Sequence, residues 1–138
     1  HPDCTYMAVC NNRQAAKGKV NHHLRLRDIE WTRRLWNYAR TYSKRVALEN
    51  PASTIFPELK KYGAQVQYIQ PWQFGHGETK KTGFALHNLP ELKPTNIVEG
   101  REQRIWRMAP GPNRKRDRSE TFPGIASAIV DQWGPLTK

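Results

Sequence analysis

Three short polar segments of the chain carry side chains that could act together on one substrate. His1-Pro2-Asp3-Cys4 supplies a thiol, Glu49-Asn50-Pro51 supplies a carboxylate, and the stretch 74–82 supplies a cation at Lys80. A thiolate can add to carbon 6 of a pyrimidine, which makes carbon 5 nucleophilic. A carboxyl group that hydrogen-bonds ring nitrogen N3 favours this addition, and a cation can hold the base carbonyl or a nearby phosphate. The three segments therefore define a candidate pyrimidine site if the fold brings them together.

The elements that must position these segments follow from the apolar pattern. Apolar runs predict three short strands, at residues 46–48, 66–69 and 83–86. A short helix that starts at Ser53 or Thr54 and stops at Gly63 separates the first two, so the expected fold class is α/β. In a parallel-type sheet adjacent strands lie ~4.8 Å apart, and ligands bind beyond the carboxyl ends of the strands. We therefore expect Cys4, Glu49 and Lys80 to surround one planar ring at that edge.

Two stretches have the periodicity of helices. A helix is predicted over residues 28–43, capped by Asp28, because apolar side chains recur there at spacings of four, three and four, at Trp31, Leu35, Tyr38 and Tyr42. We expect this stripe to belong to the core and not to form a base-stacking platform. A second helix is predicted near the C-terminal end, over residues 124–133, and residues 1–27 are expected to be loop.

The composition and net charge of the chain indicate which kinds of partner it can bind. The chain has 138 residues, enough for one domain, with a formal net charge of +11 and a sequence pI of about 10.1. Such a surplus favours a polyanionic partner, with a solvated basic surface as the alternative. Two cysteines, Cys4 and Cys10, do not make a disulfide scaffold, so a reducing cytoplasm is the default compartment. No apolar run approaches the length of a membrane span.

Several segments share their order and residue types with one enzyme family. His1-Pro2-Asp3-Cys4-Thr5-Tyr6-Met7 is similar to a His-Pro-Pro-Cys-Thr-Tyr-Leu segment, and Glu49-Asn50 follows after a later strand. The stretches 70–80 and 121–126 continue the pattern. In this order the motifs resemble those of phage- and prophage-type DNA cytosine-5 methyltransferases, over nearly the whole chain. The resemblance implies a Rossmann-like methyltransferase sheet, of which residues 1–138 form the C-terminal part only.

The resemblance also implies roles for individual residues. Cys4 matches the nucleophile, Glu49 the carboxylate that pairs with the cytosine edge, and Asn50 the residue that positions that loop. Lys80 falls where the family has an arginine near the flipped base. The implied reaction is transfer of a methyl group from S-adenosylmethionine to cytosine in DNA, in a bacterial or phage-infected cell.

Two departures from the family pattern bear on activity. Asp3 stands where family members commonly have proline, and a carboxylate beside a thiol disfavours the thiolate. The glycine-rich loop that would hold S-adenosylmethionine is also absent. We therefore expect the cofactor part to precede His1 and residues 1–138 alone not to bind the cofactor.

A short basic segment at about residues 88–121 stands where a recognition region would be expected. It is rich in arginine and lysine and includes Trp106, a mixture that suits phosphate contacts plus one stacking side chain. The expected DNA-binding residues are Arg101, Arg104, Arg107, Arg114, Lys115 and Arg116. A solvated, mobile loop is an equally good interpretation of the run 114–118.

Three functional classes stay open at this point. The first is a methyltransferase that is whole when another segment supplies the cofactor part. The second is a non-catalytic nucleic-acid-binding remnant of the same fold, and the third is a thiolate enzyme acting on free pyrimidine nucleotides. A zinc site is a weaker alternative, because Cys4, Cys10, His22 and His23 match the spacing of no standard zinc module.

Overall fold

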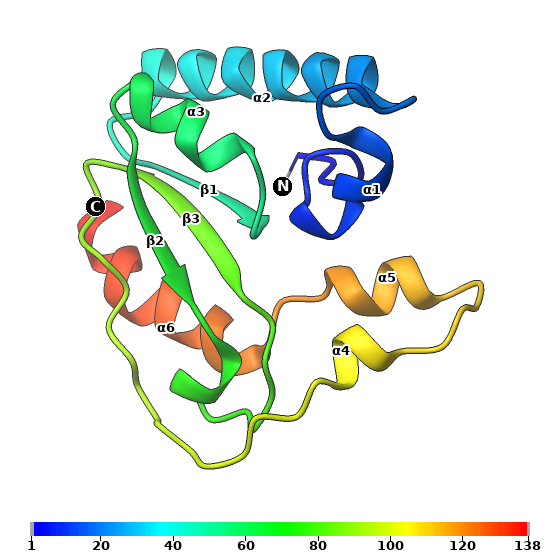
Figure 1. Cartoon of the computed structure of the whole chain (residues 1–138). Coiled ribbons are helices and arrows are strands. Elements are labelled where there is room, and N and C mark those ends of the chain that lie inside the picture. Colours follow the sequence, from blue (N-terminus) through cyan, green and yellow to red (C-terminus); the bar gives the residue numbers. More distant parts are fainter. Residues whose placement is uncertain (1, 138) are drawn as a thin grey trace. The chain divides into compact units, whose positions relative to one another are not determined.

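The computed structural model describes residues 2–137, except for the side chains of Lys115 and Thr137. The chain forms two compact units (Figure 1). Unit 1 comprises His1–Tyr68 and Thr82–Pro90, and unit 2 comprises Ile69–Lys81 and Glu91–Lys138. Each unit is thus assembled from two separate stretches of chain.

A three-stranded sheet forms the framework of unit 1. Its strands are β1 (Val46–Pro51), β2 (Gln65–Ile69) and β3 (Thr82–His87), in the order β1-β3-β2. The helix α3 (Ile55–Lys61) connects β1 to β2 and packs on β3. The predicted α/β class and all three predicted strands are therefore confirmed.

The sheet is antiparallel, so the prediction of parallel-type neighbours is wrong. The register of β1 and β3 runs from Val46 opposite His87 to Pro51 opposite Thr82. A parallel connection needs a crossover, usually an α-helix. Residues 70–81 contain only one short 3-10 helix, η2 (Pro71–Gln73), and the chain therefore turns back into β3. As a result the carboxyl end of β1 lies beside the amino end of β3.

The core of unit 1 lies between this sheet and two neighbouring helices, α2 (His22–Tyr42) and α3. It is built of fully or nearly fully buried apolar side chains from both helices, the sheet and the N-terminal segment. These side chains belong to Met7, Trp36, Leu48, Ile55, Phe56, Leu59, Ala64 and Ala85. The inclusion of Met7 is important for the site, because it ties the segment that carries Cys4 to the core.

The helix α2 starts six residues earlier than predicted, and its predicted core stripe is wrong. Trp31, Tyr38 and Tyr42 are 56 %, 65 % and 73 % exposed, whereas Thr32 and Trp36 are completely buried. The indole N–H of Trp36 donates a hydrogen bond to the Tyr62 carbonyl oxygen at the end of α3 (3.3 Å). Apolar side chains occur on two sides of α2, and contact with α3 and the sheet decides which side is buried.

The N-terminal segment, expected to be loop, contains two short helical turns. These are η1 (Val9–Asn11) and α1 (Asn12–Ala15), and α1 packs against α2. The segment before η1 contains no helix and lies beside the carboxyl end of β1. Figure 1 shows it in dark blue.

Unit 2 contains η2, three α-helices and a C-terminal 3-10 helix. The helices are α4 (Arg104–Arg107), α5 (Arg114–Ser119), α6 (Pro123–Trp133) and η3 (Gly134–Thr137). The helix predicted over 124–133 is confirmed as α6, which buries Ile125, Ala128 and Trp133. Gly124 allows this helix to approach the loop before β3, since a Cβ atom there would lie 1.9 Å from the Phe74 carbonyl oxygen.

We expect substitution of Gly83 by alanine to destabilise unit 1. A Cβ atom at Gly83 would lie 2.4 Å from two ring carbons of Phe56 and 3.0 Å from a ring carbon of Tyr68. Overpacking of this kind costs about 1–3 kcal/mol. Chemical denaturation should show the loss, and Gly111→Ala is the control because nothing lies within 4 Å of its Cβ position. Equal unfolding midpoints for the two variants would contradict the packing described here.

Candidate functional site

The segment that carries Cys4 lies against the end of β1. The backbone N–H of Val9 donates to the Ala52 carbonyl oxygen (3.1 Å), and that of Thr54 donates to the Met7 carbonyl oxygen (3.0 Å). An antiparallel bridge joins Ala8 to Ser53. Two segments that are more than 40 residues apart in the sequence are therefore adjacent, and each of them carries a predicted site residue.

Cys4 is half-buried at the start of a tight turn. Its carbonyl oxygen accepts hydrogen bonds from the N–H groups of Met7 (3.1 Å) and Ala8 (2.9 Å). Burial raises the pKa of the Cys4 thiol, and the negative charges of Asp3 and Glu49 raise it further. Glu49 is therefore within electrostatic reach of the thiol. The raised pKa favours the protonated thiol at neutral pH, and the joint action of Cys4 and Glu49 on one base stays a prediction.

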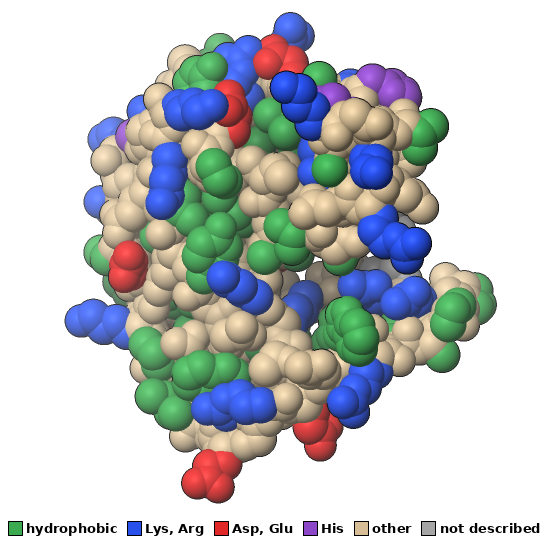
Figure 2. All heavy atoms as spheres, viewed as in Figure 1, with side chains coloured by type: hydrophobic (Ala, Val, Ile, Leu, Met, Phe, Trp, Pro, Cys, Tyr) green, Lys and Arg blue, Asp and Glu red, His purple; other side chains and the backbone are tan. Residues whose placement is uncertain are grey.

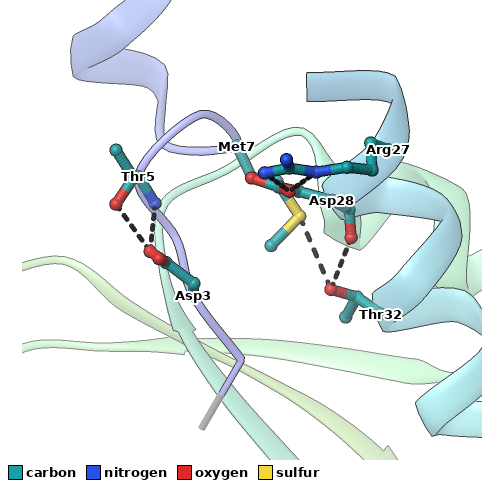
Figure 3. A network of polar contacts seen from close by, with 6 residues as sticks. All are labelled: Asp3, Thr5, Met7, Arg27, Asp28 and Thr32. Atoms are coloured by element: carbon teal, nitrogen blue, oxygen red, sulfur yellow. Dashed lines mark hydrogen bonds and ion pairs between the residues drawn. The ribbon is translucent and has the colours of Figure 1, made fainter. Parts of the chain in front are cut away.

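Asp3 has the effect on the thiol that the sequence led us to expect. Its carboxylate accepts hydrogen bonds from the backbone N–H (2.9 Å) and the hydroxyl (2.6 Å) of Thr5, as Figure 3 shows. After burial, Asp3 is the largest cause of the raised pKa of Cys4. Activation of Cys4 as a nucleophile thus requires an additional group that stabilises the thiolate.

Asn50 and Ser53 are two buried polar side chains near the end of β1. Asn50 is 0 % exposed, and neither its Oδ1 nor its Nδ2 atom has a hydrogen-bond partner among the described residues. The hydroxyl of Ser53, which is 6 % exposed, is also without one. A buried polar group without a partner costs about 1–3 kcal/mol and marks a place that calls for a functional explanation. Asn50 was predicted as a site residue from the sequence, whereas Ser53 was named there only as a possible start of a helix.

Lys80 belongs to unit 2. Its ammonium group donates a hydrogen bond to the Glu120 carbonyl oxygen (2.8 Å) and lies 5.8 Å from the centre of the Phe122 ring. In the same loop, the Nε2 atom of His76 accepts a hydrogen bond from the Gly124 N–H at the start of α6 (3.0 Å). The contacts of Lys80 within unit 2 thus involve the segment before α6, and its participation with Cys4 and Glu49 stays a prediction.

Several cations of the predicted DNA-binding segment have partners within unit 2. The guanidinium of Arg101 lies 3.9 Å from the centre of the Trp72 ring, Arg104 pairs with Glu78 (2.9 Å) and Arg116 pairs with Asp117 (3.1 Å). Arg107 is exposed and Arg114 is half-buried. The side chain of Lys115 lies outside the described residues. Part of the charge that the sequence assigns to DNA is therefore already compensated locally.

Unit 1 carries the larger positive surplus. It has twelve lysines and arginines against five acidic residues, whereas unit 2 has eleven against seven. Figure 2 shows Lys and Arg side chains spread over the face in view, with few acidic side chains between them. The DNA contacts predicted from the sequence lie at residues 101–116, in unit 2. The surplus of unit 1 could not be predicted in this way, because its lysines and arginines do not form one run in the sequence.

Comparison with known proteins gives no relative from which a function could be transferred. The chain matches no protein-family model, and it has no significant match among curated proteins or solved structures. Among the described residues no three His, Cys, Asp or Glu side chains gather as a metal site would require. Within residues 2–137 no helix has the length and apolarity needed to cross a bilayer.

We expect alkylation of Cys4 to require a higher pH than alkylation of an ordinary thiol, whose pKa is about 8.5. Burial, Asp3 and Glu49 all raise the pKa of Cys4. The experiment uses a Cys10→Ser background and follows the rate of iodoacetamide modification against pH. Asp3→Asn should lower the midpoint, and Glu49→Gln should lower it less. A wild-type midpoint at or below the ordinary value would contradict the environment described for the thiol.

Proposed function

We propose that this chain is the part of a DNA cytosine-5 methyltransferase that carries the nucleophile and the base-binding carboxylate. The observation that carries the proposal is the docking of the Cys4 segment against the end of β1, where Glu49 lies within electrostatic reach of the thiol. The proposal includes the finer fold assignment, a Rossmann-like methyltransferase sheet of which β1, β3 and β2 form one end.

The proposed chemistry uses the side chains of this site in sequence. The Cys4 thiolate adds to carbon 6 of a cytosine that has been flipped out of the duplex, and a new S–C6 bond forms. The Glu49 carboxyl group donates a hydrogen bond to N3, which takes up the electron density that the addition delivers to the ring. Carbon 5 then becomes nucleophilic and forms a bond to an electrophile. Loss of the hydrogen of carbon 5 as a proton afterwards restores the C5–C6 double bond, and the S–C6 bond breaks to release the Cys4 thiolate. Lys80 is the proposed cation for the base or its phosphate.

The described residues do not form a cradle for S-adenosylmethionine. Such a cradle needs glycines in a strand-to-helix turn. The turn from β1 to α3 is made of Ala52, Ser53 and Thr54. Among the glycines with positive φ, at 18, 63, 75 and 100, only Gly100 lies between a strand and the next helix, and it belongs to the long segment 88–103 and not to a tight turn. In the proposed enzyme another polypeptide segment binds the methyl donor.

Unit 1 offers a surface for such a segment. β1 is an edge strand, paired only with β3 in the sheet. On α2, the exposed aromatic side chains Trp31, Tyr38 and Tyr42 lie on a different side of the helix from Trp36, which contacts α3. A polypeptide that packs on this side of α2 would cover large apolar side chains that are otherwise exposed to water. The proposed partner in the complete enzyme is the cofactor-binding part.

A non-catalytic, nucleic-acid-binding remnant is the second candidate function. The observation that favours it is the raised pKa of Cys4, caused first by burial and then by Asp3. A thiol held in its protonated form is a poor nucleophile. In this alternative the chain retains its positive charge and binds DNA without acting on it, in the cytoplasm of a bacterial or phage-infected cell.

The two candidates differ in whether the chain exchanges the hydrogen at carbon 5 of cytosine. Addition of Cys4 to carbon 6, protonation of carbon 5 by solvent and elimination would replace deuterium at carbon 5 by hydrogen, without any methyl donor. We expect mass spectrometry to detect this exchange in a pool of duplexes that presents 5-deuterocytosine in all sequence contexts. Cys4→Ser and Glu49→Gln should abolish it, whereas the control Cys10→Ser should retain it.

Each other outcome of this experiment has a definite meaning. Exchange that survives Cys4→Ser would assign the nucleophile elsewhere. Absence of exchange in DNA that is bound would reject catalysis by this chain and favour the remnant. Exchange in free deoxycytidine monophosphate but not in DNA would favour an enzyme of free nucleotides.

Both candidates predict duplex binding that weakens steeply with salt. The net charge of +11 favours release of counterions from phosphates, with a log–log slope of about −0.9 for each phosphate contact. Fluorescence anisotropy over a salt series measures the slope. Replacing the exposed Arg107 by glutamine should reduce the slope by about one contact, whereas Glu91→Gln is the control on an exposed acidic residue. A flat salt response would favour a merely solvated basic surface.

A further inference from the structure

Arg25 is the most unusual charged residue of unit 1. It lies in the first turn of α2 and is 5 % exposed. Among the described residues no carboxylate pairs with it, and its guanidinium donates only to uncharged oxygens. Burial of a cation without a counter-charge is costly, and the amino end of a helix disfavours a cation further. A purely apolar side chain would avoid both costs, so the position of this guanidinium calls for an explanation.

The hydrogen bonds of Arg25 converge on the segment that carries Cys4. Its Nε donates to the carbonyl oxygen of Tyr6 (2.6 Å), and one terminal nitrogen donates to that of Ala8 (3.4 Å). The other terminal nitrogen donates to the side-chain oxygen of Asn12 (2.9 Å), which orients the guanidinium. The two carbonyl groups lie two and four residues after Cys4. The planar guanidinium group of Arg25 thus holds the turn that begins at Cys4.

A second contact holds the same turn from the same helix. The hydroxyl of Thr32 lies 3.7 Å from the sulfur of Met7 and donates to the Asp28 carbonyl oxygen (2.8 Å). Figure 3 shows Met7 reaching from the N-terminal segment toward Thr32. The contact between the Thr32 hydroxyl and the Met7 sulfur is weak, whereas the hydrogen bonds from the Arg25 guanidinium are directional. Of these two contacts from α2, that of Arg25 is the directional one.

We propose that Arg25 is the positioning residue of the thiol site, because its buried guanidinium holds the carbonyl oxygens of Tyr6 and Ala8 and thereby sets where Cys4 lies relative to Asp3 and Glu49. This inference relies on the proposed function only for the reason why the thiol needs to be positioned. Its test uses the thiol alone and needs neither DNA nor a methyl donor, so failure of the proposed function would leave the test valid.

The experiment compares Arg25→Gln and Arg25→Lys with wild type, all in a Cys10→Ser background. The groups that act on the Cys4 thiol are Asp3, Glu49 and Cys10. Release of the turn should expose the thiol and move it away from these groups, which lowers the pH midpoint of its alkylation. A shift of one pKa unit means an about tenfold faster reaction below the midpoint. Lysine keeps the positive charge but lacks the planar guanidinium group. In Arg25→Lys the pH midpoint of Cys4 alkylation should therefore lie between those of Arg25→Gln and wild type.

Arg27→Gln is the matched control, since Arg27 lies on the same helix with its side chain 65 % exposed and paired with Asp28. It should leave the alkylation profile of Cys4 unchanged. A merely structural role for Arg25 would lower the unfolding temperature without moving the midpoint in the folded protein. A folded Arg25→Gln protein with the wild-type midpoint would therefore overturn the proposal.

A second variant keeps the proposal testable if Arg25→Gln does not fold. Asn12 is exposed, and its replacement by alanine removes only the group that orients the guanidinium. We expect Asn12→Ala to shift the alkylation midpoint of Cys4 in the same direction by a smaller amount. An unchanged midpoint in this folded variant would equally overturn the proposal.

Discussion

The interaction on which the site depends is the docking of residues 4–8 between α2 and the end of β1. Met7 is completely buried in the core of unit 1, and its carbonyl oxygen accepts the Thr54 N–H. On the other side, Arg25 holds the carbonyl groups of the same turn. Because one short segment contacts both the helix and the strand, Cys4 is placed near Glu49 although 45 positions separate the two residues in the sequence.

The environment of the thiol is unfavourable for a nucleophile in isolation. Burial and two carboxylates raise the pKa of Cys4, and Asn50 is buried without a hydrogen-bond partner among the described residues. Functional sites commonly retain such costs, because the groups are arranged for a bound state. In the proposed methyltransferase, the bound base would receive the hydrogen bond of Glu49, and a cation from the base or phosphate side would favour the thiolate.

The aromatic side of α2 shows how far the sequence pattern could be followed. The period of Trp31, Leu35, Tyr38 and Tyr42 correctly predicted a helix, because the period depends only on helical geometry. The same pattern wrongly predicted which side is buried. Contact with α3 selects the side of Trp36, and the hydrogen bond from its indole to Tyr62 confirms that choice. The exposed aromatic side is in turn the surface proposed for a further polypeptide segment.

Local patterns determined the elements of this protein, because strand and helix periodicity are properties of short stretches. The three strands, the helix at 124–133 and the polar segments that carry Cys4 and Glu49 could all be predicted in this way. The tertiary structure alone decided the antiparallel sheet, since the chain between β2 and β3 lacks a crossover helix. The tertiary structure alone also decided the role of Arg25. Its guanidinium is buried and holds two carbonyl groups only because Tyr6 and Ala8 lie against its helix in the folded chain.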